Sequence, residues 1–219
     1  MLPEGDIFCR SKPHRLPDEA YRTPGQAVGV TIRARPTTPS LVEGSRPALV
    51  LDALYSAAEL KRCAVIAHCL LPDHLHFLMC VLDADGHILK AINSFKQYSA
   101  RCLHDSGIQK PAWIRDFWDR HVRGHSDYVK VEWYIANNPV HHGLCGDPRE
   151  WPFTARNGWP SPPLLAAYDV GEQGSSPLLT AHGGRAGKLA PPDGVRRAGR
   201  EVVFRKKVSC PSAWNHASV

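Results

Sequence analysis

The sequence lacks several features that would assign a membrane setting or a metal class. No apolar run reaches the ~18 residues of a membrane-spanning helix. The opening MLPEGDIFCR carries acids where a secretion signal has a basic start and an apolar block. Its seven cysteines include no C-x-x-C pair of the kind that binds zinc or cycles between thiol and disulfide. We therefore expect a reduced, cytoplasmic protein without a membrane partner.

Charge and composition divide the chain at about residue 155. The formal net charge is +6, and residues 156–219 hold nine basic and four acidic residues, so most of the excess lies there. That region is rich in Gly, Pro and Ser, which predicts a largely disordered tail. It is either a basic arm that holds polyanionic DNA or an extension with incidental charge, and we favour the second reading. Residues 1–155 are predicted to form one domain.

Periodicity within residues 1–155 predicts alternating strands and helices. β-branched and apolar runs predict strands, three- and four-residue apolar spacings predict helices, and Pro72 and Asp73 mark a turn between two strands. Ser126 is expected to cap the last helix and Pro139 to end it. The expected strands are 27–34, 63–71, 74–82 and 113–123, and the expected helices are 46–62, 86–104 and 127–138.

This order predicts an α+β fold. A β-α-β-β-α-β succession is the ferredoxin-like, split β-α-β arrangement, an antiparallel sheet with helices on one face. A C-terminal helix and the largely disordered tail follow it.

The stretch LPDHLHFLM, residues 71–79, places two histidines inside an apolar strand. Side chains at i and i+2 of a strand share a face, so His74 and His76 project together while Leu75 and Phe77 point the other way. Such a pair could lean toward one divalent ion. It could equally be a pair of buried histidines satisfied by backbone carbonyls, because H-x-H alone is common by chance.

A tyrosine on the following helix is a candidate nucleophile. Tyr98 and Cys102 are one helical turn apart in SFKQYSARC, and Lys96 and Arg101 flank the tyrosine. A tyrosine in a helix is more often a core residue. Beside a metal and basic residues, however, a phenol suits attack on phosphorus.

Four ordered motifs resemble those of the single-tyrosine HUH transposases. LPDHLHFLM is similar to their M-P-[ND]-H-[VL]-H-[LF]-L-[LM] signature, and SFKQYSARCLH to their S-x-K-x-Y-[TS]-A-R helix. WIRDFWDRHVR and YIANNPVHHGLCGDPREWPFT are similar to two further blocks. The opening RLPDEAYRTPGQAVGVTIRA resembles that of the REP-associated branch, and the likeness covers about residues 10–155.

The resemblance implies a bacterial, nucleoid-associated enzyme that cuts and rejoins single-stranded DNA around palindromic hairpins, as a monomer or homodimer. His74 and His76 would hold Mg²⁺ or Mn²⁺, and Tyr98 would form a 5′-phosphotyrosine and release a 3′-OH. In the family a Gln, Asn or Glu ligand often stands four residues after the tyrosine. Here that position is Cys102, a poor ligand for Mg²⁺, so a relative that binds palindromic DNA without cutting it is the alternative.

Basic residues near these motifs are the expected phosphate contacts, although any one of them could be a solvated surface charge. Asn137 and Asn138 are expected to end a helix, with DNA contact as the second possibility, and the tryptophans to be mainly packing residues. The predicted DNA-binding residues are Lys96, Arg101, Arg115, Arg120 and Arg123.

Overall fold

The computed structural model describes residues 15–108, 112–156 and 159 of the chain. Apart from Arg156 and Trp159, the predicted tail lies outside the described residues. Its disorder, its role and the domain boundary at residue 155 therefore remain predictions.

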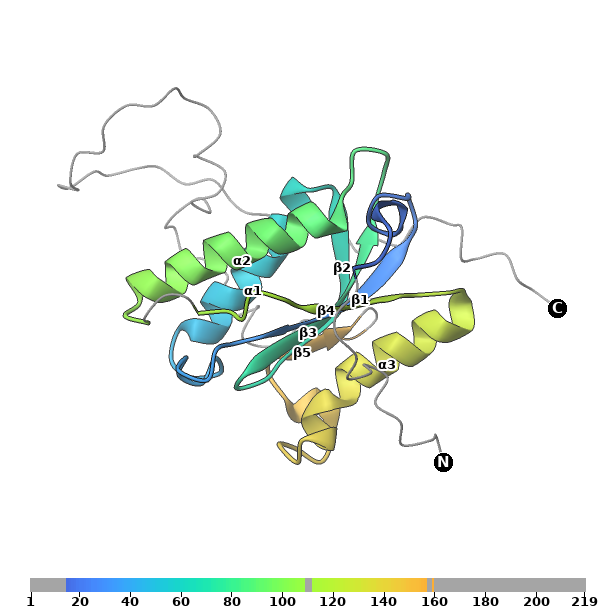
Figure 1. Ribbon diagram of the computed structural model, residues 1–219. Coiled ribbons are helices and arrows are strands. Elements are labelled where there is room, and N and C mark those ends of the chain that lie inside the picture. The colour runs from blue at the N-terminus through green and yellow to red at the C-terminus, as the bar shows by residue number, and fades with distance from the viewer. Residues whose placement is uncertain (1–14, 109–111, 157–158, 160–219) are drawn as a thin grey trace, which may run out of the picture.

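Five strands form one sheet and three α-helices pack on it (Figure 1). The predicted order of elements is confirmed, with an additional short strand at the end. The strands are β1 (Ala27–Arg33), β2 (Cys63–Leu70), β3 (His74–Val81), β4 (Trp118–His121) and β5 (Thr154–Arg156); the helices are α1 (Arg46–Leu60), α2 (Ile88–Asp105) and α3 (His125–His141); and two 3₁₀ turns are η1 (Asp18–Tyr21) and η2 (Pro148–Glu150).

The sheet has the order β4-β1-β3-β2-β5, and every pairing in it is antiparallel. β2 and β3 form the predicted hairpin through Pro72 and Asp73. In Figure 1, α1 and α2 lie together on one side of the sheet and α3 lies on the other. The expectation of helices on one face therefore holds for α1 and α2, while the added C-terminal helix covers the opposite face.

Two hydrophobic cores, one on each face, follow from the alternation of side chains along β3. Leu75 and Phe77 belong to the larger core with α1 and α2, together with Met79 and Val81. Leu78 and Cys80 belong to the smaller core, which includes Val131 and Ile135 of α3. Residues of even number in β3 therefore face α3.

The predicted strand 113–123 is correct only in its second half. β4 spans Trp118–His121, and Trp113 makes a single bridge with Ala34. The indole of Trp113 is instead buried, and its Nε1 donates to the Ser99 hydroxyl at 2.9 Å. Packing this large side chain against α2 takes the backbone of the segment out of the ladder.

Both predicted ends of the last helix were wrong. Ser126 lies inside α3, and the residue before the helix is Gly124, whose φ of 88° suits a residue without a Cβ. Pro139 also lies inside the helix, which continues to His141. A proline removes one intrahelical hydrogen bond without ending the pattern, and here the backbone N–H of His142 still donates to the carbonyl of Asn138.

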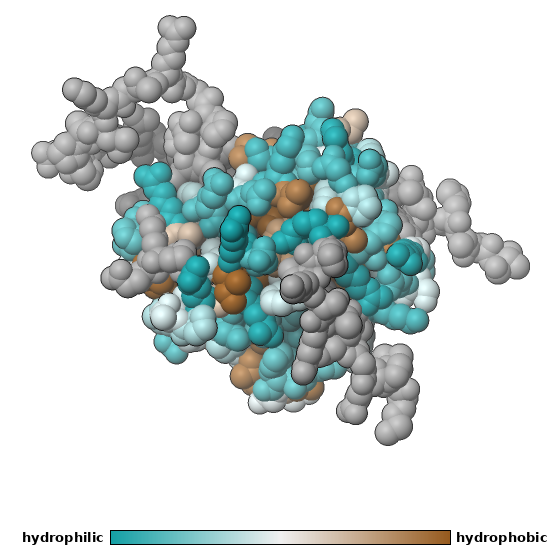
Figure 2. Space-filling model, in the orientation of Figure 1, coloured by the Kyte–Doolittle hydropathy of each residue, from teal (hydrophilic) through white to brown (hydrophobic). Residues whose placement is uncertain are grey.

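The surface seen in Figure 2 is mostly hydrophilic, with small separate hydrophobic patches. The large apolar side chains that are exposed in the described ranges are scattered over two helices and a loop: Leu60, Val129, Trp133 and Leu144. Within residues 15–108 and 112–156, no helix combines the length and hydrophobicity needed to cross a membrane.

Candidate functional site

His74 and His76 lie side by side on the face of β3 that α3 covers. Their ring centroids are 4.7 Å apart, and each residue retains only 5% of its surface exposed. The predicted projection of both imidazoles from one face is confirmed, because Leu75 and Phe77 pack in the core of the other face.

Each imidazole is held at its Nδ1 atom by a neighbouring oxygen. Nδ1 of His74 lies 2.6 Å from Oδ1 of Asp73, and Nδ1 of His76 lies 2.7 Å from the hydroxyl oxygen of Thr31 on β1. Carboxylate and hydroxyl oxygens can both accept an Nδ1–H hydrogen bond, which leaves the lone pair on Nε2. With Nδ1 as the donor in both hydrogen bonds, each ring would present Nε2 as the atom that coordinates a metal.

The charge state of the pair also suits metal binding. Burial lowers the pKa of His74, although the Asp73 carboxylate opposes the shift. Burial lowers the pKa of His76 further, and the nearby charges of His74 and His142 act in the same direction. Both imidazoles are therefore neutral at pH 7, the form that coordinates a cation.

α3 presents a tyrosine and an asparagine toward the histidine pair. The Tyr134 ring centroid is 6.1 Å from that of His76, with the rings nearly perpendicular. Asn138 follows one helical turn later, is 2% exposed, and donates from Nδ2 to the Tyr134 carbonyl at 2.8 Å. Residues four apart share a helix face, so Tyr134 and Asn138 approach the sheet together.

Two more histidines border this face at the end of α3. His142 lies 5.3 Å from His74 between ring centroids, and His141 lies 5.8 Å from Tyr134. Both side chains belong to exposed residues. They form the solvent side of the site, opposite the anchoring oxygens of Asp73 and Thr31.

The structure does not bring Tyr98 or Cys102 to the histidines. Tyr98 packs against the core between α1 and α2, and its hydroxyl hydrogen-bonds to the Cys102 thiol. The sheet separates these two residues from His74 and His76, so the expected juxtaposition was wrong. The local pattern of the strand places both histidines on one face of the sheet. It does not determine which face α2 covers, and this is why the prediction failed.

The donor set near the histidine pair fits a hard or borderline divalent cation. Among the residues described, no three His, Cys, Asp or Glu side chains converge closely enough to hold a metal. Asparagine is not one of these four residue types, but its amide oxygen is a hard ligand for divalent cations. His74, His76 and Asn138 together offer two nitrogens and one oxygen, a combination that suits Mn²⁺ and Mg²⁺ with water in the remaining positions.

The five predicted DNA contacts are spread over both faces. Lys96 is half-buried, and its ammonium donates to the carbonyls of Ile114 and Arg115. Arg120 pairs with Asp127 on the α3 side. The remaining three belong to exposed residues on α2, between α2 and β4, and before α3: Arg101, Arg115 and Arg123.

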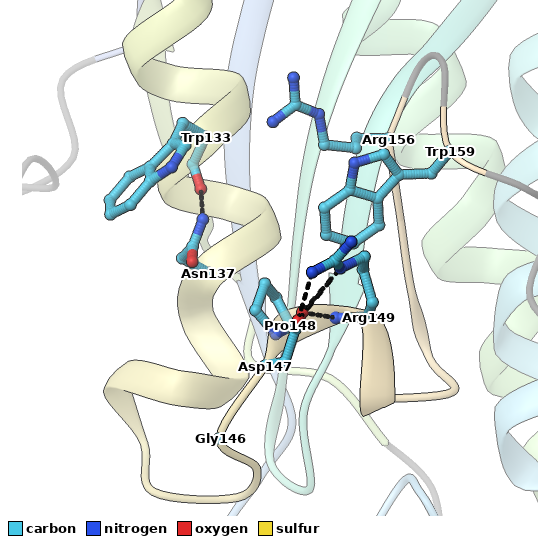
Figure 3. Close-up of a pocket in the computed structure, with 8 residues that line it drawn as sticks. All are labelled: Trp133, Asn137, Gly146, Asp147, Pro148, Arg149, Arg156 and Trp159. Atoms are coloured by element: carbon cyan, nitrogen blue, oxygen red, sulfur yellow. Dashed lines mark hydrogen bonds and ion pairs between the residues drawn. The ribbon is translucent and has the colours of Figure 1, made fainter.

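A shallow hollow of about 400 Å³ lies beside α3 but does not include the histidine pair. Figure 3 shows Trp133 and Asn137 of α3 on one side and Trp159 on the other, with Arg149 paired to Asp147 at its base. Because its lining contains neither Tyr134 nor a histidine, we regard the histidine pair as the candidate site.

Comparison with known proteins gives a match over the middle of the chain. Residues 41–138, which include β2, β3, α2 and most of α3, match the family described as "Transposase IS200 like". Over these residues the chain is similar to the IS200-like transposases. The resemblance seen in the motifs is thereby confirmed.

The relatives of this chain include two curated bacterial proteins. It is 31% identical over 104 residues to a Haemophilus influenzae protein named as a REP-associated tyrosine transposase, covering 41% of this chain and 57% of that protein. It is 29% identical over 84 residues to an Escherichia coli REP-associated tyrosine transposase, covering 38% of this chain and 48% of that one. The matches thus span about half the length of these relatives.

A solved structure shares the fold of this chain. It is a REP-associated tyrosine transposase bound to a REP hairpin, with a TM-score of 0.56 and 23% identity over 69% of this chain and 90% of that one. The ferredoxin-like fold with an additional helix is therefore the fold of a solved transposase of this kind.

Sequence reasoning missed the pair Tyr134 and Asn138, although the signal was present. The block YIANNP contains a tyrosine followed four residues later by an asparagine, which is the spacing that the family resemblance requires. We expected the asparagines to end a helix, and Pro139 favoured that interpretation. In the structure Asn138 is instead buried within α3, one turn after the tyrosine.

Proposed function

We propose that this chain cuts and rejoins single strands of DNA at the His74 and His76 site, with Tyr134 as the nucleophile. One observation carries the proposal: α3 places the Tyr134 ring 6.1 Å from His76, whereas Tyr98 lies across the sheet. The family match supports the reaction class, and the geometry supports the choice of tyrosine.

The proposed reaction conserves the energy of the phosphodiester. The Tyr134 oxygen attacks phosphorus and its phenolic proton passes to solvent, while the bond from phosphorus to the 3′ oxygen breaks. The leaving 3′ oxygen takes up a proton, so the products are a 5′-phosphotyrosine and a 3′-OH. Attack of a 3′-OH on the phosphotyrosine reverses these steps and joins strands without ATP.

His74, His76 and Asn138 are the residues that would hold Mg²⁺ or Mn²⁺. When bound, such an ion would polarise the scissile phosphate and stabilise the charge that develops on its oxygens. Asp73 and Thr31 keep the two imidazoles oriented with Nε2 toward the site. Asn138 stands four residues after Tyr134 and so matches both the spacing and the residue type of the family's third ligand. Cys102, four residues after Tyr98, matches only the spacing.

The proposed substrate is a single strand that carries a palindromic hairpin. The solved relative is bound to a REP hairpin, and the curated relatives are named for the same association. We extend that substrate class to this chain because the match includes the histidine strand and the tyrosine helix.

The binding-only alternative no longer has the support that Cys102 lent it. That thiol counted against catalysis only if it stood beside the metal, and it lies with Tyr98 on the far side of the sheet. Binding without cleavage therefore becomes an outcome of the experiment.

The first prediction concerns the covalent intermediate. Purified protein is incubated with Mn²⁺ and a radiolabelled single strand containing a short palindrome, then separated on a denaturing gel. We expect label on the wild type and on Tyr98→Phe, none on Tyr134→Phe, and at least 100-fold less on Asn138→Ala, because losing one essential group typically costs about that much.

The four proteins separate the possibilities. Label lost in Tyr98→Phe but kept in Tyr134→Phe would return the nucleophile to α2. Tight binding of the strand by the wild type, with no label on any protein, would establish the binding-only alternative. A folded Tyr134→Phe protein, verified by circular dichroism, keeps the comparison valid.

A further inference from the structure

An arginine that the motif comparison did not select lies directly beside the histidine pair. In the register of β1 against β3, Arg33 is opposite His74 and Thr31 is opposite His76. Directly paired residues of antiparallel strands project from the same face with Cβ atoms about 5 Å apart. Arg33 therefore shares the site with both imidazoles, and its charge acts on both of them.

The Arg33 guanidinium is held in place by an indole. Its central carbon lies 5.5 Å from the centroid of the Trp118 ring, a cation-π contact between β1 and β4. Trp118 pairs with Thr31 in the register, which places the indole on the same face as His76. A guanidinium stacked on a ring keeps its edge N–H groups available for hydrogen bonds.

The charge of Arg33 acts on the Asp73 carboxylate, but no hydrogen bond or ion pair joins the two in the part of the chain that the structure describes. Its side chain takes part in no hydrogen bond or ion pair there, and the residue is exposed. By contrast, Arg120 on the same face is paired with Asp127, and Lys96 is bound to backbone carbonyls. Of these three cations, Arg33 is the one whose side chain makes no hydrogen bond or ion pair within the described residues.

The electrostatics of the site create a need for such a cation. A phosphate that approaches His74 also approaches the Asp73 carboxylate, which lies 2.6 Å from the Nδ1 atom of that ring. A guanidinium offers two parallel N–H groups that match phosphate oxygens, and it keeps its charge at any pH the protein survives.

We propose that Arg33, positioned by Trp118, binds the scissile phosphate of the strand at the His74 and His76 site. The inference rests on the proposed function, and it assigns Arg33 as a substrate-binding residue and Trp118 as a positioning residue. Arg33 donates N–H groups to non-bridging phosphate oxygens and stabilises the charge that they gain as Tyr134 attacks.

The test compares Arg33→Ala, Arg33→Lys and Trp118→Leu with Arg22→Ala. Arg22 is an exposed arginine that precedes the opposite end of β1, so its removal changes the net charge equally without touching the site. Single-turnover cleavage is measured with Mn²⁺ and the palindromic strand. We expect Arg33→Ala to be slower by about 100-fold, Arg33→Lys and Trp118→Leu to be intermediate, and Arg22→Ala to match the wild type.

Two readouts exclude a purely structural role. Millimolar guanidinium ion should restore part of the rate of Arg33→Ala and none of the rate of Tyr134→Phe. The second readout replaces the phosphate at the mapped cleavage position by a neutral methylphosphonate, and binding of the strand is measured in EDTA. This change should weaken binding by the wild type but not by Arg33→Ala, because the variant already lacks the contact between Arg33 and the phosphate. The assignment would be overturned if Arg33→Ala cleaved the strand at the wild-type rate, or if the methylphosphonate weakened binding equally in the wild type and in Arg33→Ala. Either result would leave the proposed function intact.

The inference can be judged even if the wild type does not cleave. Binding of the strand in EDTA is then measured against salt concentration. Loss of one phosphate contact should reduce the slope of log K on log salt by about 0.7 in Arg33→Ala, and not in Arg33→Lys. An unchanged slope in Arg33→Ala would reject the phosphate contact.

Discussion

At the scale of the residue, the candidate site depends on atoms that hold the two imidazoles. Asp73 follows the turn before β3, and Thr31 comes from the neighbouring strand, so one anchor is local and the other is cross-strand. Thr31 is itself buried, with 6% of its surface exposed. A buried hydroxyl in a strand is costly unless it is hydrogen-bonded, and here its partner is Nδ1 of His76.

Removing that hydroxyl should weaken metal binding. We expect Thr31→Val, which keeps the shape of the side chain, to lower Mn²⁺ affinity by about 10- to 100-fold, the usual effect of losing an outer-shell partner. Titration followed by electron paramagnetic resonance of free Mn²⁺ measures this directly. Thr31→Ser retains the hydroxyl and should bind nearly as the wild type does; equal affinity of Thr31→Val and wild type would show that the anchor has no role.

At the scale of the element, α2 is joined to the segment before β4 by Lys96 as well as by the Trp113–Ser99 hydrogen bond. Lys96 donates to the carbonyls of Ile114 and Arg115 at 2.7 and 2.6 Å. Burial lowers the pKa of its ammonium, with the Asp116 charge opposing the shift. The residue was expected to contact DNA, but these bonds indicate that its charge serves to hold residues 112–117 against α2.

Lys96→Met should therefore affect stability more than DNA affinity. We expect the free energy of unfolding to fall by about 2 kcal/mol, because two charge-assisted hydrogen bonds to carbonyls are lost. Urea unfolding measures the change, and Lys90→Met on the exposed face of the same helix provides the matched control. A drop in DNA affinity and in its salt dependence, without loss of stability, would instead support the phosphate contact.

At the scale of the whole molecule, the face of the sheet opposite the site carries a titratable group in its core. His68 on β2 is fully buried, and its Nδ1 lies 3.0 Å from the Tyr55 hydroxyl of α1. Its Nε2 has no hydrogen-bond partner in the described structure. Burial lowers the pKa of His68 to about 4.

This group should make the protein sensitive to mild acid. Because the folded-state pKa lies below the ordinary value of about 6.5, the unfolded chain binds the proton more readily. The stability is complete above pH 6.5 and is lost as the pH falls toward 4, by roughly 3 kcal/mol at most. We expect His68→Gln to flatten this loss in urea unfolding at several pH values. His104→Gln, which changes a half-exposed histidine, should not; parallel curves for wild type and His68→Gln would contradict the assignment.

Local patterns in the sequence determined the elements and their order. The strand 74–82 and the helix 46–62 were predicted within a few residues, because periods of two and 3.6 residues are properties of short segments. The same local geometry required His74 and His76 to share a face. The spacing between Tyr134 and Asn138 was also present in the sequence, but no local pattern showed that this face of the helix meets the histidines.

Only the tertiary structure decided which helix meets the histidines. The alternation of side chains along a strand shows which residues share a face. The face of the sheet on which each helix packs, however, depends on how the whole chain buries both faces at once. α1 and α2 pack together over Leu75 and Phe77, so the face with His74 and His76 is left for α3. That choice brought Tyr134 and Asn138 to the pair, placed Tyr98 and Cys102 behind the sheet, and left Arg33 beside the site through the register of β1. The reason is that packing depends on contacts between segments far apart in the chain, and local sequence patterns do not specify those contacts.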